Sequence, residues 1–239
     1  MTLIEHLEEL RNRIFIALIA WVIAASIAFI FRLDILSWLK QPLPHDMTLY
    51  QFNILEPFLV SMQIAGFFGF VLASPIIGWQ TWAFIAPGLY DEERRWSVPF
   101  IIGTAISFTF GVIFARYVVL PFALPILLGF LSGETNLLLS TNDYISKLLL
   151  YMAVFGIVFE MPVLSFLLAR LGLVYAQPLR KYRRHALVVG CIIAAAITPT
   201  ADPINFFLVA GPLVILYEIS ILVVRYAQRR VPVSDITLK

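Results

Sequence analysis

The sequence has little charge and almost no cysteine. Only 13% of its 239 residues are charged, whereas a soluble domain has about 25%, so a soluble globular protein is excluded. The chain is 61% hydrophobic, and its mean hydropathy of +0.90 requires several apolar spans rather than one anchor. The single cysteine, Cys191, excludes an internal disulfide and a cysteine metal cluster.

Sequence signals of catalysis are weak. The chain contains no H-E-x-x-H zinc helix, no G-x-S-x-G elbow and no P-loop, and it shows no dinucleotide or nucleic-acid pattern. Its three histidines, His6, His45 and His185, lie far apart. We therefore predict that the protein is not an enzyme and that it binds neither a metal nor a cofactor. We also expect no cleavable leader, because three acids precede the first apolar run.

Long apolar runs dominate what the sequence does contain. A helix needs about 20 apolar residues to cross a bilayer core. The predicted fold is an all-α polytopic membrane protein, a single domain over residues 1–230 with short interfacial helices on the outer side and a tail at 231–239. The six predicted spans cover about 14–31, 58–84, 96–120, 144–170, 185–199 and 205–225. The last two are short, so we expect the lipid to thin around them.

Prolines are expected to shape two of the spans. Pro75, with Gly78, is predicted to bend the second span before an aromatic belt from Trp79 to Trp82. Pro121 is predicted to end the third span, which leaves the apolar segment 122–131 interfacial or re-entrant.

Lys and Arg are distributed unevenly between the two sides of this arrangement. Six spans place both termini on one side, and that side carries all of the 17 basic residues except Arg32, Lys40, Arg116 and Lys147. The positive-inside rule therefore predicts that both termini are cytoplasmic.

The same predicted side carries a dense set of acids. Glu5, Glu8 and Glu9 precede the first span, and residues 91–93 (Asp-Glu-Glu) follow the second. Acids contribute little to topology, whereas spaced carboxylates suit a guanidinium ligand, which they bind in a bidentate manner. The alternative is that these acids pair with neighbouring arginines or form a solvated loop.

One acid, Glu160, interrupts the fourth apolar run. Arg170 lies ten residues further on, about 15 Å along a helix axis, so Glu160 is expected near the middle of the bilayer. Pro162 weakens the backbone beside it, because proline lacks an N–H and crowds a carbonyl one turn back. An acid at this depth is a candidate functional residue. The alternative is a protonated acid that serves packing alone.

Several short motifs follow one another in the chain. They are residues 6–13 (His-Leu-Glu-Glu-Leu-Arg-Asn-Arg), 74–75 (Ser-Pro), Gln80, Trp82, Phe84, 87–90 (Pro-Gly-Leu-Tyr), 93–95 (Glu-Arg-Arg), 159–162 (Phe-Glu-Met-Pro), 180–184 and 198–199 (Thr-Pro) before Asp202. In type and order they resemble the motifs of the TatC family, the six-span core of the twin-arginine protein translocase. The resemblance covers residues 3–227. The acids at 91–92 depart from the usual pattern, and the tail has no counterpart.

The resemblance implies a receptor for folded cargo proteins that carry a twin-arginine signal peptide. It also implies that the proton gradient drives the export of this cargo. It implies that Glu9 and Glu93 recognise the arginine pair, with His6, Glu8 and Arg94 beside them. It assigns partner contacts within the membrane to Glu160, Pro162 and Gln80, and structural or functional roles to Pro75, Phe84 and Asp202.

The implied partners are single-span TatA- and TatB-like subunits, the lipid bilayer and further copies of the chain, in the inner membrane of a prokaryote. A different interpretation of the same residues is a proton- or ion-coupled transporter of small molecules, with Glu160 as the proton site. Inverted repeats with paired broken helices would favour that alternative, and the sequence does not clearly show them.

Overall fold

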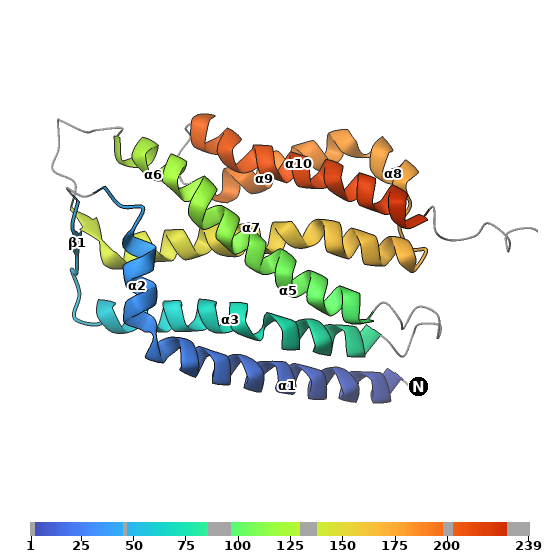
Figure 1. The fold of residues 1–239 in the computed structure, drawn as a ribbon, viewed down its shortest axis with the longest axis horizontal. Coiled ribbons are helices and arrows are strands. Elements are labelled where there is room, and N and C mark those ends of the chain that lie inside the picture. Colours follow the sequence, from blue (N-terminus) through green and yellow to red (C-terminus); the bar gives the residue numbers. More distant parts are fainter. Residues whose placement is uncertain (1–2, 45–46, 86–96, 130–137, 198–202, 229–239) are drawn as a thin grey trace, which may run out of the picture.

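The computed structural model describes residues 3–44, 47–85, 97–129, 138–197 and 203–228 (Figure 1). The elements in chain order are α1 (Leu3–Ile30), α2 (Arg32–Lys40), β1 (Leu49–Tyr50), α3 (Glu56–Ile85), α5 (Ser97–Phe114), the π-helical segment η2 (Ala115–Val119), α6 (Leu120–Gly129), β2 (Leu139–Ser140), α7 (Thr141–Arg170), α8 (Ala176–Lys181), α9 (Arg183–Ile197) and α10 (Pro203–Gln228). The protein is thus an all-α membrane protein.

Five helical stretches in the described part of the chain are long and apolar enough to cross a membrane. They are α1, α3, the stretch from α5 into α6, α7 and α10. The predicted fifth span corresponds to α9, whose 15 residues cover about 22 Å at 1.5 Å per residue. That length is below the roughly 30 Å of a hydrocarbon core, so the predicted count of six spans depends on a thin bilayer at α9.

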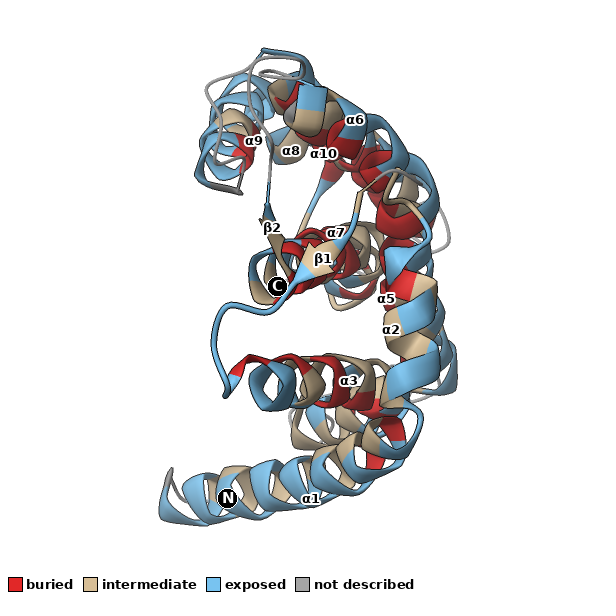
Figure 2. Cartoon of the chain, turned by 90° about the vertical axis from the view of Figure 1, so that its left-hand side faces the viewer, coloured by how far each residue is buried: buried red, intermediate tan, exposed pale blue. Residues whose placement is uncertain are grey.

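The helices form an arc that begins with α1 and ends with α9 (Figure 2). Helix α1 packs on α3, α3 packs on α5 and α7, and α10 joins α7 to α9. The start of α1 and the end of α10 lie at one end of the bundle, and α2 and β1 lie at the other (Figure 1). Strand β1 pairs with β2 in parallel there, with Leu49 opposite Leu139.

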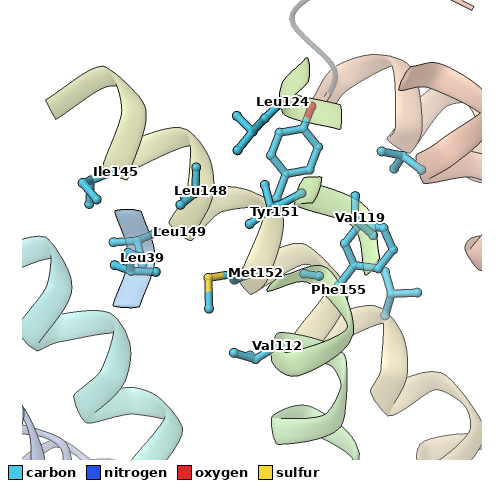
Figure 3. Packing of buried hydrophobic residues seen from close by; sticks show 14 of the residues in the cluster. Leu39, Val112, Val119, Leu124, Ile145, Leu148, Leu149, Tyr151, Met152 and Phe155 are labelled. Atoms are coloured by element: carbon cyan, nitrogen blue, oxygen red, sulfur yellow. The ribbon is translucent and has the colours of Figure 1, made fainter. Parts of the chain in front are cut away.

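The main hydrophobic core is built around α7. Leu148, Met152 and Phe155 of α7 are almost completely buried, and they pack with residues of α5, η2 and α6 such as Val112 and Val119 (Figure 3). Helix α7 therefore needs apolar side chains on most of its circumference, which explains why its sequence shows a continuous apolar run rather than a stripe.

The predicted first span, about 14–31, lies within a longer helix, because α1 is continuous from Leu3 to Ile30. The prediction that Pro121 ends the third span is wrong, since the helix continues through it to Gly129.

The π-helical turn explains how the helix passes Pro121. Proline lacks the N–H that would bond the carbonyl four residues back, and its ring crowds that carbonyl. Just before it, the Leu120 N–H bonds to the Ala115 oxygen, five residues back. A π-bulge of this kind widens the turn, which makes room for the ring without ending the helix.

Candidate functional site

Five side chains from two distant parts of the sequence meet where α1 begins and α3 ends. We call them the α1–α3 polar cluster. They are His6, Glu9 and Arg13 of α1 and Gln80 and Phe84 of α3.

Close packing of α1 on α3 brings the two halves of this cluster together. A side chain at Gly69 would lie within 2.5 Å of the Ala25 Cα, so only glycine allows this approach of the two backbones. The Trp21 indole N–H donates a hydrogen bond of 2.8 Å to the Gly66 oxygen. These contacts fix the rotation of α1 on α3 in the middle of the pair, and the polar face of α1 then meets the end of α3.

Glu9 lies at the centre of the cluster. Its Oε1 accepts a hydrogen bond of 3.0 Å from Arg13 Nη2, and Arg13 Nη1 donates to Gln80 Oε1 at 3.3 Å. The other carboxylate oxygen, Oε2, lies 4.0 Å from His6 Nδ1 and has no hydrogen-bond partner in the described residues. The Glu9 side chain is only 17% exposed, so this oxygen is sheltered from bulk water.

His6 and Phe84 close one side of the cluster. Their rings stack with centroids 4.3 Å apart and planes 15° apart. A flat apolar surface beside a carboxylate suits a guanidinium group, which can stack on a ring while it bonds to an acid. The cluster can therefore bind a cationic ligand with planar geometry, and it contains no arrangement of nucleophile and base.

Glu160 forms a second candidate site, in the second half of α7. It is partly buried, and its Oε2 is enclosed without a hydrogen-bond partner in the described residues. Pro162 lies inside the same helix, and Ser107 of α5 donates a hydrogen bond of 2.5 Å to the Phe159 oxygen. The backbone that proline weakens is thus supported from the neighbouring helix, while the acid retains bonding capacity.

Polar side chains also join α3 to the first turns of α7, well before Glu160. Gln63 Nε2 donates to Asn142 Oδ1 at 3.2 Å, and Ser146 Oγ donates to Gln63 Oε1 at 3.0 Å. Glu160 lies 18 residues after Asn142, which is five full turns of an ideal helix. By this count, Glu160 lies on the same side of α7 as Asn142, which contacts α3.

The structure places the remaining predicted site residues separately. Glu8 is exposed, and Pro75 lies inside the uninterrupted helix α3. Gln80, predicted beside Glu160 as an intramembrane partner contact, bonds to Arg13 in the polar cluster. Glu93, Arg94 and Asp202 lie outside the described residues.

Sequence reasoning missed two buried charged residues. Glu56 is 5% exposed and Arg116 is 3% exposed. Arg116 Nη2 donates to the Trp38 oxygen at 2.7 Å and to Gln41 Oε1 at 3.2 Å, and its guanidinium lies over the Trp38 ring, 4.9 Å from the centroid. An arginine inside an apolar run is itself a signal of a buried partner, and this one attaches α2 to η2.

Comparison with known proteins gives a consistent result. The family model described as "Sec-independent protein translocase protein (TatC)" matches residues 5–212. The chain belongs to the TatC family. It is 40% identical over 230 residues to the TatC protein of Deinococcus radiodurans, covering 93% of this chain and 85% of that protein. It is 39% identical over 237 residues to TatC of Aquifex aeolicus, covering 96% of this chain and 97% of that protein.

A solved structure agrees with the sequence comparison. The fold is similar to the crystal structure of the twin-arginine translocase receptor TatC, with a TM-score of 0.83 and 37% identity over 94% of this chain and all of that one. Family membership makes the protein a multi-pass membrane subunit of the Sec-independent protein translocase, and not an enzyme. The alternative of a small-molecule transporter is not supported.

Proposed function

We propose that this TatC-family protein binds twin-arginine signal peptides at its α1–α3 polar cluster and organises TatA- and TatB-like single-span subunits for export driven by the proton gradient. The observation that carries the proposal is the environment of Glu9. This carboxylate is held by Arg13 on one oxygen and keeps the other without a hydrogen-bond partner among the described residues.

The bonding geometry around Glu9 suits an arginine side chain of the peptide. Because Oε2 is enclosed, the Glu9 side chain must turn outward before a guanidinium can bond to this oxygen. The plane of the guanidinium can then rest against the stacked His6 and Phe84 rings. Arg13 and Gln80 keep the carboxylate within the cluster before the ligand arrives. Such preorganisation lowers the entropic cost of binding.

A second acid is expected from the segment that follows α3. Helix α3 ends at Ile85, one residue after Phe84, so the chain leaves α3 at the polar cluster. We propose that Glu93 binds the second arginine of the pair, with Glu8 and Arg94 adding to the charge pattern around the peptide. Two carboxylates would then match two guanidinium groups.

We propose that Glu160 and Pro162 form the surface that meets single-span partners or the inserted signal peptide. The support is an acid enclosed in the membrane segment beside a backbone carbonyl that Pro162 leaves without its helical donor. Several copies of the chain would act together in the assembled complex.

We further propose six spans with both termini in the cytoplasm of a prokaryotic cell. The first and last described residues, Leu3 and Gln228, lie at the same end of the bundle (Figure 1), and that end carries the excess of Lys and Arg in the sequence. The polar cluster then faces the compartment in which cargo folds.

The test is the binding of three versions of one signal peptide to the purified protein in detergent. The versions carry the arginine pair, a lysine pair or a glutamine pair at the same positions. We expect affinity to fall in that order, because an ammonium group keeps the charge and loses the planar fork. Equal affinity for the arginine and glutamine peptides would contradict the proposal.

A further inference from the structure

A groove of about 520 Å³ runs between α9 and α10, at the opposite end of the arc from the polar cluster. We call it the α9–α10 groove. Gly190, Ile193 and Leu213 lie along its apolar length. Its polar and charged end is formed by Tyr182, Arg183, Arg184, His185 and Glu218.

The length of the groove corresponds to one leaflet of a bilayer. From Arg184 to Ile193 the axis of α9 rises about 14 Å at 1.5 Å per residue. Half of a hydrocarbon core of roughly 30 Å is about 15 Å. The apolar wall therefore covers the depth of one leaflet, with the charged end at the level of the headgroups.

The charged end has more positive charge than its acid neutralises. Arg183 bonds to Glu218 at 2.6 Å, whereas the exposed Arg184 has no ion pair within the described ranges. These cations begin helix α9, where the helix dipole is also positive and disfavours them. An anion bound at this end would offset both effects.

The charge of the groove favours a lipid with an anionic headgroup over an apolar helix, because the exposed Arg184 lies at one end of an apolar wall.

We propose that the α9–α10 groove binds an anionic glycerophospholipid, with the phosphate at Arg184 and His185 and one acyl chain along Gly190, Ile193 and Leu213. The site shares no residue with the α1–α3 polar cluster, and it borders the proposed partner surface at Met161, which lies between Glu160 and Pro162. A lipid held here would become part of the surface that the short helix α9 presents to the membrane.

Photocrosslinking of the full chain in vesicles tests the proposal. The probe is phosphatidylglycerol with a diazirine in its acyl chain, and phosphatidylcholine with the same diazirine is the matched neutral probe. We expect phosphatidylglycerol to label residues of α9 and α10 along the groove, and Arg184→Gln to lower that labelling about tenfold, the loss of one charge-assisted contact.

Two further variants separate this site from general attraction to a basic surface. Arg180→Gln removes the same charge from α8, outside the groove, and should leave labelling unchanged. Ile193→Trp fills the apolar part and should reduce labelling with Arg184 intact. Equal labelling by both lipids, equal loss in Arg180→Gln and Arg184→Gln, or full labelling of Ile193→Trp would overturn the proposal. Circular dichroism and gel filtration confirm that each variant is folded.

Discussion

The carboxylate of Glu56 accepts a hydrogen bond of 2.7 Å from the backbone N–H of Asn142, which joins the first turn of α3 to the first turn of α7. The same oxygen accepts from Ser140 Oγ at 2.7 Å, and the other oxygen accepts from the Phe52 N–H at 2.8 Å. The first N–H groups of a helix lack partners within the helix and favour negative charge. Glu56 therefore caps α7 from a neighbouring element.

Replacing Glu56 should loosen the end of the bundle at which α2 and β1 lie. In Glu56→Gln one carboxylate oxygen becomes an amide N–H₂, which cannot accept the bonds that oxygen now accepts. We expect the melting temperature to fall by several degrees and hydrogen exchange to accelerate at β1 and β2. Asp143→Asn removes an exposed acid from the same turn of α7. It loses only the attraction to the helix dipole, so the melting temperature should fall much less and exchange at β1 and β2 should stay unchanged. A similar loss in both variants would show that charge alone matters.

Arg116 should hold α2 on the bundle. Its side chain donates to Trp38 and Gln41, and hydrogen bonds to charged groups contribute about 1.5–3 kcal/mol each. We expect Arg116→Met to accelerate hydrogen exchange in residues 32–41 at least about tenfold while the exchange of α7 stays slow. Arg116→Lys should restore the protection only in part, because an ammonium lacks the planar fork. Unchanged exchange in α2 would contradict this assignment.

Gly111 should be intolerant of even a methyl group. A Cβ at this position would collide with the Phe155 carbonyl of α7, whereas a Cβ at Gly129 would meet nothing within 4 Å. We expect Gly111→Ala to destabilise the protein by about 1–3 kcal/mol, the usual cost of overpacking. Gly129→Ala should be neutral or slightly stabilising. Unfolding in denaturant measures both variants, and equal stability would show that α5 and α7 can separate without cost.

The long apolar helices were predictable because the requirement to satisfy every backbone group in lipid leaves few alternatives to a helix. The continuation of the helix through Pro121 was not predictable. A proline ends a helix unless the preceding turn can widen, and here the widened turn depends on the packing of Ala115 and Val119. The length of α9 followed from the charges that flank it. The position of α9 at the edge of the arc could not be predicted, because its sequence does not indicate which helix it packs against.

The candidate site was predictable in part. His6 and Glu9 are close in sequence, and their acidic surroundings indicated a cationic ligand. The role of Gln80 was not visible, because its contact with Arg13 bridges 67 positions and depends on the rotation of α1 on α3. Glu56 was overlooked because an acid before a span usually lies in water, and only the tertiary structure brings α7 to it.

Glu9 should contribute strongly to signal-peptide affinity. Glu9→Gln removes the carboxylate and releases Arg13, which adds repulsion toward an arginine peptide. A charge-assisted bond of about 1.5–3 kcal/mol corresponds to a loss of roughly ten- to hundredfold in affinity. Asp34→Asn, an exposed acid on α2 at the opposite end of the bundle, is the matched control and should bind normally. Fluorescence anisotropy with a labelled peptide measures the affinity of both variants. Normal binding by Glu9→Gln would show that Glu9 is not part of the peptide-binding site.

Glu160 should contribute to partner association through a hydrogen bond. Its enclosed Oε2 has no hydrogen-bond partner in the described residues, so the carboxyl group can bond to a polar group on a partner helix once the side chain turns outward. Glu160→Gln keeps the size and a donor, whereas Glu160→Ala removes both. Polar contacts between membrane helices average about 0.6 kcal/mol and reach about 1.7, so Ala should weaken association about threefold and at most about twentyfold.

Co-purification of a tagged single-span partner from membranes measures this association. Ile23→Ala changes an exposed apolar residue on α1, away from α7, and should leave the partner yield unchanged. We expect Glu160→Gln to retain most of the co-purified partner and Glu160→Ala to lose most of it. If both variants lose the partner equally, a hydrogen bond donated by residue 160 does not hold the partner, because glutamine can still donate one. If Ala retains the partner fully, Glu160 serves packing within the protein, and the partner surface lies elsewhere on the arc.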